Sequence, residues 1–139
     1  MIREKDVIRV KVPYPTINDG LALSPHMYIC KQSNADQYEY VKCQTLKPYM
    51  LTKGTMQHFH DEQPDPLRNP FRRTTRIDCD KIFSTYLVKY DDALKTYPRS
   101  DVCDDLFRLV LQELATDGYD CIQVDEGKLV LLNELISFI

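Results

Sequence analysis

Two histidines and two acids stand together in this chain, and such side chains are common ligands of zinc. His58 and His60 flank Phe59, and Asp61 and Glu62 follow directly. On a strand, residues two apart share a face, so both imidazoles would point to one side. No further ligand stands at a recognised metal-binding spacing, and the polar side chains of a solvated loop are the simpler account. We therefore expect no metal ion and no cofactor.

An arginine-rich run follows this segment and has the composition of a phosphate-binding surface. Residues 66–76 contain four arginines and no acidic residue. Guanidinium groups donate paired hydrogen bonds to phosphate oxygens, and an aromatic ring offers a stacking surface to an unpaired base. The run therefore predicts contact with single-stranded RNA, and the alternative is a solvated surface without a ligand. The expected RNA-binding residues are Arg68, Asn69, Phe71 and Arg72.

Arg76, Asp78 and Asp80 alternate along the next apolar segment, so they would share one face of a strand. A carboxylate beside an arginine provides a general base next to a group that stabilises negative charge. The alternative is a face of cross-strand ion pairs. A serine hydrolase is not indicated, because the chain has no Gly-x-Ser-x-Gly motif. Its four glycines also form no phosphate-binding loop.

The size and charge of the chain limit the classes of protein to which it belongs. Its 139 residues suffice for one domain, spanning 1–139, with its own core. The net charge is −3, and residues 100–126 hold eight acids against one arginine. The basic run can still attract a polyanion locally. Five widely spaced cysteines, and the lack of an apolar run of about 18 residues, favour a cytoplasmic protein with reduced thiols and no membrane segment.

Alternating apolar residues predict the strands that position these side chains. Residues 6–13 and 38–45 alternate between apolar and polar, and residues 26–31 form a short apolar run. We expect the last two of these strands to form a hairpin. A loop over 14–25, with a turn at Asn18-Asp19-Gly20, separates the first strand from the hairpin.

A long interruption precedes the second half of the chain. Residues 46–74 contain four prolines and no sustained period, so we expect a long insertion loop there. A strand is expected over 75–83. After Ser100 as N-cap, apolar residues at helical spacing predict a helix over 101–116. The predicted fold class is mainly β (α+β), a small barrel or curled sheet with a C-terminal helix packed on it.

The order of these pieces resembles the MazF/PemK-like superfamily of bacterial toxins, also called the Kid or CcdB-like fold. Its members have an opening strand, a loop ending in Arg-Pro before a buried strand, a strand that ends in threonine, and a later strand with a basic and an acidic residue. The matching segments here are 5–10, 24–30, 41–45 and 79–84. With the helix near the C-terminus, the resemblance covers residues 5–115.

The resemblance implies an SH3-like barrel, usually a homodimer, that pairs with a cognate antitoxin protein. It also implies a metal-independent endoribonuclease, in which the 2′-hydroxyl of single-stranded RNA attacks the adjacent phosphate. That reaction needs a base, an acid and a cation. By position, Thr45 corresponds to the strand-end threonine and Asp80 to the later acid, and Arg73 or Arg76 would supply the cation.

The chain departs from the family pattern in the loop before the buried strand. Ser24 precedes Pro25, where many members have arginine. His26 follows the proline, and its ordinary pKa near 6.5 suits an acid or a base. The alternative is a catalytically inactive module of the same fold, phage-related or regulatory, that binds protein or nucleic acid. The expected catalytic residues are His26, Thr45, Arg73, Arg76 and Asp80.

Overall fold

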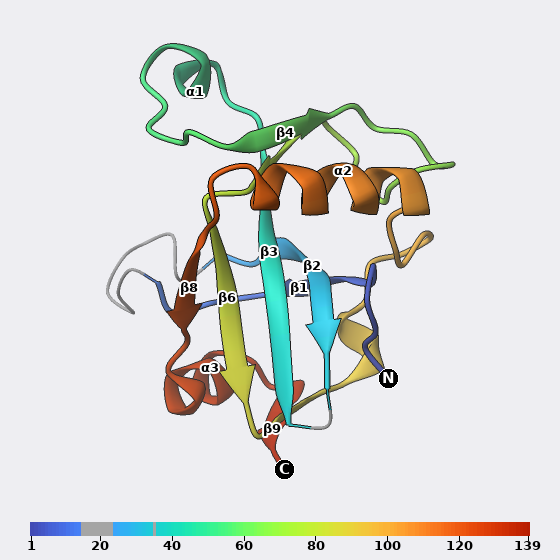
Figure 1. The fold of residues 1–139 in the computed structure, drawn as a ribbon. Helices are drawn as coiled ribbons and strands as arrows, with labels where there is room; N and C mark the ends of the chain where they lie inside the picture. Colours follow the sequence, from blue (N-terminus) through green and yellow to red (C-terminus); the bar gives the residue numbers. More distant parts are fainter. Residues whose placement is uncertain (15–23, 35) are drawn as a thin grey trace.

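The computed structural model describes residues 1–14, 24–34 and 36–139, which form a mainly β protein with a few helices, as predicted (Figure 1). The strands are β1 (Val7–Val10), β2 (His26–Ser33), β3 (Gln37–Thr45), β4 (Phe59–Glu62), β5 (Thr75–Asp78), β6 (Lys81–Tyr86), β7 (Val88–Tyr90), β8 (Asp120–Gln123) and β9 (Ile136–Phe138). The helices are α1 (Pro48–Thr52), the 3₁₀ helix η2 (Asp92–Leu94), α2 (Asp104–Ala115) and α3 (Glu126–Leu132). The expected turn at Asn18-Asp19-Gly20 lies outside the described residues.

Strand β3 is the centre of the larger sheet and has different partners along its length. It pairs antiparallel with β2 along one side, which confirms the predicted hairpin. Along its other side it pairs with β6 near Gln37 and with β5 near Thr45. The single strand predicted over 75–83 is therefore two strands, which meet at a turn through Cys79 and Asp80.

The larger sheet has seven strands and is open. Its main path runs β1-β2-β3-β5-β4, and β6 connects β3 to β8. In the described part of the chain, no pairing joins β1 to β4 or to β8 to close a barrel. The prediction of a mainly β, α+β fold with a helix on its sheet is confirmed at this coarser level.

Helix α2 covers one face of the sheet, crossing the strands near one end (Figure 1). Its buried residues Leu106, Val110 and Leu114 pack against a cluster that includes Val7 and Ile29. The helix begins three residues later than predicted, because its N-cap is Cys103 and not Ser100. The Sγ of Cys103 accepts a hydrogen bond from the Leu106 amide at 3.4 Å, whereas the Ser100 carbonyl accepts one from the Val7 amide.

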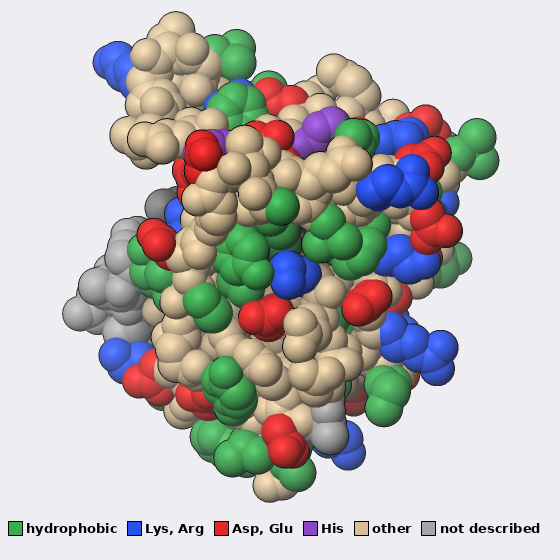
Figure 2. All heavy atoms as spheres, viewed as in Figure 1, with side chains coloured by type: hydrophobic (Ala, Val, Ile, Leu, Met, Phe, Trp, Pro, Cys, Tyr) green, Lys and Arg blue, Asp and Glu red, His purple; other side chains and the backbone are tan. Residues whose placement is uncertain are grey.

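A second apolar cluster fills the other face of the sheet, where α3 and the small β7–β9 sheet lie. Figure 2 shows apolar side chains below α2 in this view, with charged side chains among and around them. Burial raises the pKa of the Cys30 and Cys79 thiols to about 12. These two cysteines are therefore protonated, unreactive core residues at neutral pH.

The segment 46–74 is not a simple loop. It contains α1 and the strand β4, which pairs with β5 from Phe59–Asp78 to Glu62–Thr75. The sequence did not reveal this strand, because only four residues pair and Pro64 and Pro66 follow it closely. The longest helix among the described residues has 12 residues, and no helix in this part of the chain is long and apolar enough to span a lipid bilayer.

Candidate nucleic-acid interface

Three neighbouring cavities meet at Arg9 and share parts of their walls. One, of about 380 Å³, lies between Arg9, Arg72 and Tyr97. The other two, of about 170 and 160 Å³, both include Met27 and Thr45 in their walls. We call the surface formed by the three cavities the Arg9 groove. It is lined by Arg9, His26, Met27, Thr45, Arg72, Arg73 and Tyr97.

The strand register explains why Arg9 is exposed at this place. Arg9 lies opposite Met27, which lies opposite Cys43 on β3. Because alternate residues share a face, Arg9 is on the same face as Val7, which is buried in the cluster that packs on α2. Arg9 itself is exposed, beyond the core that the helix covers. The groove is therefore the uncovered end of the sheet face on which α2 packs.

The groove contains cations that have no acidic partner among the residues the structure describes. In the described ranges of the chain, no ion pair or hydrogen bond involves the side chains of Arg9, Arg72 or Arg73. By contrast, Arg68 and Arg76 are each paired with a carboxylate. Among the described residues, no aspartate or glutamate lines any of the three cavities. Arginines without a carboxylate partner are suited to binding phosphate groups.

His26 and Thr45, two of the predicted catalytic residues, both line the 170 Å³ cavity. Burial, and secondarily the charge of Lys42, lowers the pKa of His26 below 6.5, so its ring is neutral at pH 7. Its Nε2 atom is buried and has no hydrogen-bond partner within the described residues. The alternation of β2, however, places this side chain on the face of Tyr28, opposite to Met27.

Two of the predicted RNA-binding residues are internal, which corrects our expectation for them. The Phe71 ring is only 5% exposed and packs in the core beneath α2, so it offers no stacking surface to a base. Asn69 is 1% exposed, and its amide group bonds the Glu62 carboxylate, the Gln63 carbonyl and the Phe71 amide. Both residues anchor the loop that carries Arg72 and Arg73, because an aromatic ring and an amide are stable inside when packed and hydrogen-bonded.

Arg68 belongs to the same internal network. Its Nε donates to Glu62 Oε2 at 2.7 Å, and His60 Nε2 lies 3.0 Å from Glu62 Oε1. Burial alone would raise the pKa of Glu62, but its hydrogen bonds with Arg68 and His60 hold it below the ordinary value. Glu62 is therefore a buried carboxylate that joins β4 to the loop, and Arg68 is not among the residues that line the groove.

Arg76 and Asp78 are also structural in their contacts. Arg76 is 4% exposed, forms a two-point ion pair with Asp61, and lies 3.7 Å from the centre of the Phe59 ring. Asp78 is 2% exposed and binds Lys81 at 2.9 Å. The face that we considered for acid–base chemistry is thus a set of cross-strand and local ion pairs, which was the alternative interpretation.

Asp80 lies in a different cavity, of about 560 Å³, between the β5–β6 turn and the end of α2. His58 bridges this region: its Nδ1 is 3.0 Å from Asp80 Oδ1, and its Nε2 is 2.8 Å from Asp117 Oδ2. The hydrogen bonds to Asp80 and Asp117 raise the pKa of His58. Despite partial burial, the Gln57 amide and His58 lower the pKa of Asp80. The structure therefore does not bring Asp80 together with His26, Thr45 and Arg73.

His58 and His60 do not converge on a common point. They bind different carboxylates, and Figure 2 shows histidine side chains with acidic neighbours over β4. Across the described ranges, no group of three or more His, Cys, Asp or Glu side chains is arranged to hold a metal ion. The acids beside each histidine act as its hydrogen-bond partners.

Sequence reasoning missed three residues of the groove, Arg9, Met27 and Tyr97. Arg9 looked like an ordinary solvent-facing residue of an alternating strand, and Tyr97 stands in a segment without periodicity. A signal for Arg9 would have required knowledge of where α2 ends on the sheet. Comparison with known protein families, with curated proteins and with solved structures finds no match for this chain.

Proposed function

We propose that the chain binds single-stranded RNA in the Arg9 groove and cleaves it without a metal ion. The observation that supports this proposal is the convergence of Arg9, Arg72 and Arg73, from β1 and from the loop before β5, with no acid among the described residues that line the groove. Each guanidinium can bind a phosphate of the strand. The groove is lined at one end by His26 and Thr45, which have the functional groups that the reaction needs.

In this proposal the RNA supplies its own nucleophile. The 2′-oxygen bonds to the adjacent phosphorus as the bond from phosphorus to the 5′-oxygen breaks, which leaves a cyclic phosphate and a 5′-hydroxyl. Neutral His26 takes the proton of the 2′-hydroxyl, and the imidazolium so formed returns this proton through a water molecule to the leaving 5′-oxygen. Thr45 donates a hydrogen bond to the phosphate. Arg73 stabilises the charge on the phosphate oxygens. Asp80 and Arg76 have no part in this version of the mechanism.

A second candidate function is an RNA-binding module without catalysis. Two observations favour it: no carboxylate lines the groove in the part of the chain that the structure describes, and the alternation of β2 directs His26 to the opposite face from Arg9 and Met27. A groove with cations but no competent base would bind RNA and leave it intact. Both candidates use the same arginines and differ only in what happens to the strand.

The wider proposal is that the chain is a MazF/PemK-like toxin of the cytoplasm, built on an SH3-like barrel. The antiparallel arrangement of β1, β2 and β3, the partners that β3 shares between β5 and β6, and helix α2 support it. On this proposal the protein forms a homodimer, and a cognate antitoxin covers the groove with an acidic segment, because the groove arginines would bind carboxylates as well as phosphates.

The test is an incubation of the purified protein with a long single-stranded transcript in EDTA, with the ends of all fragments mapped. The variants are His26→Ala and Arg73→Ala, and Asp80→Asn is the matched control outside the groove. Discrete cuts that disappear in both groove variants and persist in Asp80→Asn support the nuclease. Binding without cuts supports the module, and the absence of RNA binding at low salt refutes both candidates.

A further inference from the structure

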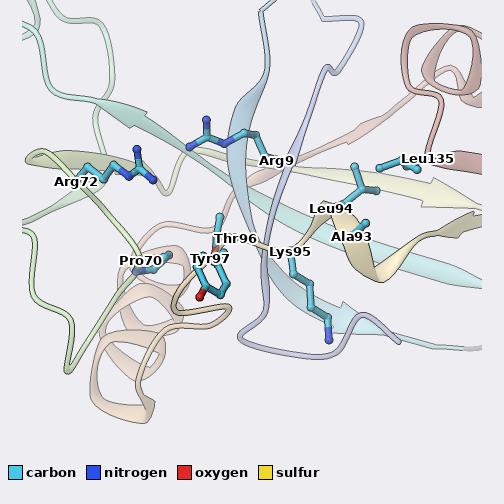
Figure 3. Close-up of a pocket in the computed structure, with 9 residues that line it drawn as sticks. All are labelled: Arg9, Pro70, Arg72, Ala93, Leu94, Lys95, Thr96, Tyr97 and Leu135. Carbon is cyan, nitrogen blue, oxygen red and sulfur yellow. The ribbon is translucent and has the colours of Figure 1, made fainter.

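The largest of the three cavities in the groove has walls of two kinds (Figure 3). Its volume of about 380 Å³ is within the range of roughly 300–1,000 Å³ that is typical of small-molecule sites. Pro70, Leu94 and Leu135 provide apolar surface, and Arg9 and Arg72 provide positive charge. A ligand that fills it should therefore combine a flat apolar part with an anionic part.

Tyr97 provides the flat surface. Tyr97 is 85% exposed, so its ring is accessible to a ligand at the wall of the cavity. The backbone around it is held in place: the Thr96 amide donates to the Val7 carbonyl at 3.0 Å, and Arg99 Nη1 donates to the Pro66 carbonyl at 3.2 Å. A ring on a fixed backbone loses little conformational freedom when a planar ligand stacks on it.

Arg9 and Arg72 provide the charge. Figure 3 shows their side chains extending toward each other from opposite sides of the cavity, on the side where Tyr97 and Pro70 lie. The third cation of the wall, Lys95, points away in the same view and is bound to Asp6 at 3.4 Å. The two guanidinium groups are thus the cations of this cavity that have no carboxylate partner among the described residues, and both can bind one phosphate.

We propose that this cavity binds one nucleotide of an RNA strand, with its base on Tyr97 and its phosphate between Arg9 and Arg72. The inference rests on the proposed RNA-binding function and assigns a base-stacking subsite within it. The cavity meets the 160 Å³ cavity at Arg72, so the next phosphate of the strand would reach Arg73. Stacking is tolerant of base identity, so the subsite selects for an unpaired base and purines bind more tightly.

The experiment uses short single-stranded RNAs in which 2-aminopurine replaces one base at a time. Stacking quenches the fluorescence of this base, so the quenched position reports the nucleotide on Tyr97. The variants are Tyr97→Ala, which removes the ring, and Tyr97→Phe, which keeps it. Tyr86→Ala is the matched control, because Tyr86 is also an exposed tyrosine but pairs with Gln37 at the other end of β3 from Thr45.

We expect quenching at one position in the native protein, its loss in Tyr97→Ala, and a fall in affinity of about 5- to 150-fold. Tyr97→Phe and Tyr86→Ala should bind within about twofold of the native protein, since both retain the stacking ring at position 97. Unchanged affinity and quenching in Tyr97→Ala would overturn the subsite and leave the proposed function intact.

A second arm separates the subsite from the proposed function. Adenosine 5′-monophosphate is titrated into the native protein and into Tyr97→Ala, with ribose 5-phosphate as the ligand that lacks a base. Binding of the nucleotide that depends on Tyr97, in a protein that binds no RNA, supports the subsite for a free nucleotide and overturns the proposed RNA function. Equal binding of ribose 5-phosphate and nucleotide overturns base stacking.

Discussion

Arg76 on β5 and Asp61 on β4 lie opposite each other on adjacent strands and form a two-point ion pair. The Nε–Oδ1 distance is 2.8 Å and the Nη2–Oδ2 distance is 2.9 Å. The guanidinium is almost fully buried, and it also donates to the Met50 carbonyl. Arg76 thereby joins α1, β4 and β5. A charge held in this way is not available to a substrate in the groove.

The first prediction concerns the stability that this pair provides. Asp61→Ala leaves the Arg76 charge buried without its partner, so we expect a loss of about 3 kcal/mol in the free energy of unfolding, the lower end of the range for buried pairs because Asp61 is partly exposed. Asp61→Asn should lose less, since its amide oxygen still accepts one hydrogen bond. Urea denaturation measures both, and equal stability of Asp61→Ala and the native protein would contradict the buried-pair interpretation.

The second prediction separates the groove arginines from the other cations. Replacing Arg9, Arg72 or Arg73 by alanine should weaken RNA binding and reduce the slope of log affinity against log salt by about 0.7 for each phosphate that the variant no longer neutralises. Lys128→Ala is the matched control, because Lys128 is an exposed cation on α3, outside the groove. Binding titrations at several salt concentrations give the slopes. If Lys128→Ala flattens the slope as much as Arg72→Ala, RNA binds the protein diffusely rather than through the groove.

The third prediction contrasts two neighbours in one loop. Asn69→Ala removes the partner of the Phe71 amide and of Glu62, so we expect a loss of about 1–3 kcal/mol in stability. Arg72→Ala changes an exposed side chain and should alter stability by less than about 0.5 kcal/mol. RNA affinity, measured where both variants are folded, should show the reverse order. A larger affinity loss in Asn69→Ala than in Arg72→Ala would contradict this division of roles between the two residues.

The fourth prediction concerns the pH dependence of cleavage. If His26 is the base, it acts in its neutral form, and its pKa is lowered by burial. The rate should therefore be constant through pH 7 and fall only below pH 6.5, as the imidazole becomes protonated. His26→Ala should slow cleavage by about 10²- to 10⁴-fold. A rate that falls already above pH 7, or that survives in His26→Ala, would assign the base to another group.

The fifth prediction concerns the His58 bridge between β4 and the end of α2. Its folded-state pKa is raised, so its contribution to stability is complete below pH 6.5, the unfolded value, and is lost as the pH rises through the folded-state pKa. The Asp80 pKa is lowered, so the stability that ionised Asp80 contributes is present above pH 3.8 and is lost as the pH falls below that value. The native protein should therefore exceed His58→Gln in stability most clearly between pH 4 and 6.5. Urea denaturation at pH 5.5 and pH 8 measures the difference, and a constant difference would show that His58 does not titrate as the bridge requires.

Local patterns of apolar residues were enough to predict most of the elements. Alternation over 6–13 and 38–45 predicted β1 and β3, and the apolar stripe through Leu106, Val110 and Leu114 predicted α2. Such patterns can be recognised in the sequence because the period of a strand or a helix is set by its own backbone geometry. The resemblance in the order of segments also led us to predict that Thr45, at the end of β3, and His26, at the start of β2, belong to one site.

Which side chains meet depends on the tertiary structure. The burial of Phe71, the pairing of Arg76 with Asp61, and the separation of Asp80 from Thr45 all follow from the change of partner along β3 and from where α2 ends over the sheet. An exposed arginine on β1 and an exposed tyrosine after η2 have no signature in the sequence, because burial and cross-strand register are set by residues far apart in the chain. The chemistry of the Arg9 groove is thus a property of packing rather than of any motif.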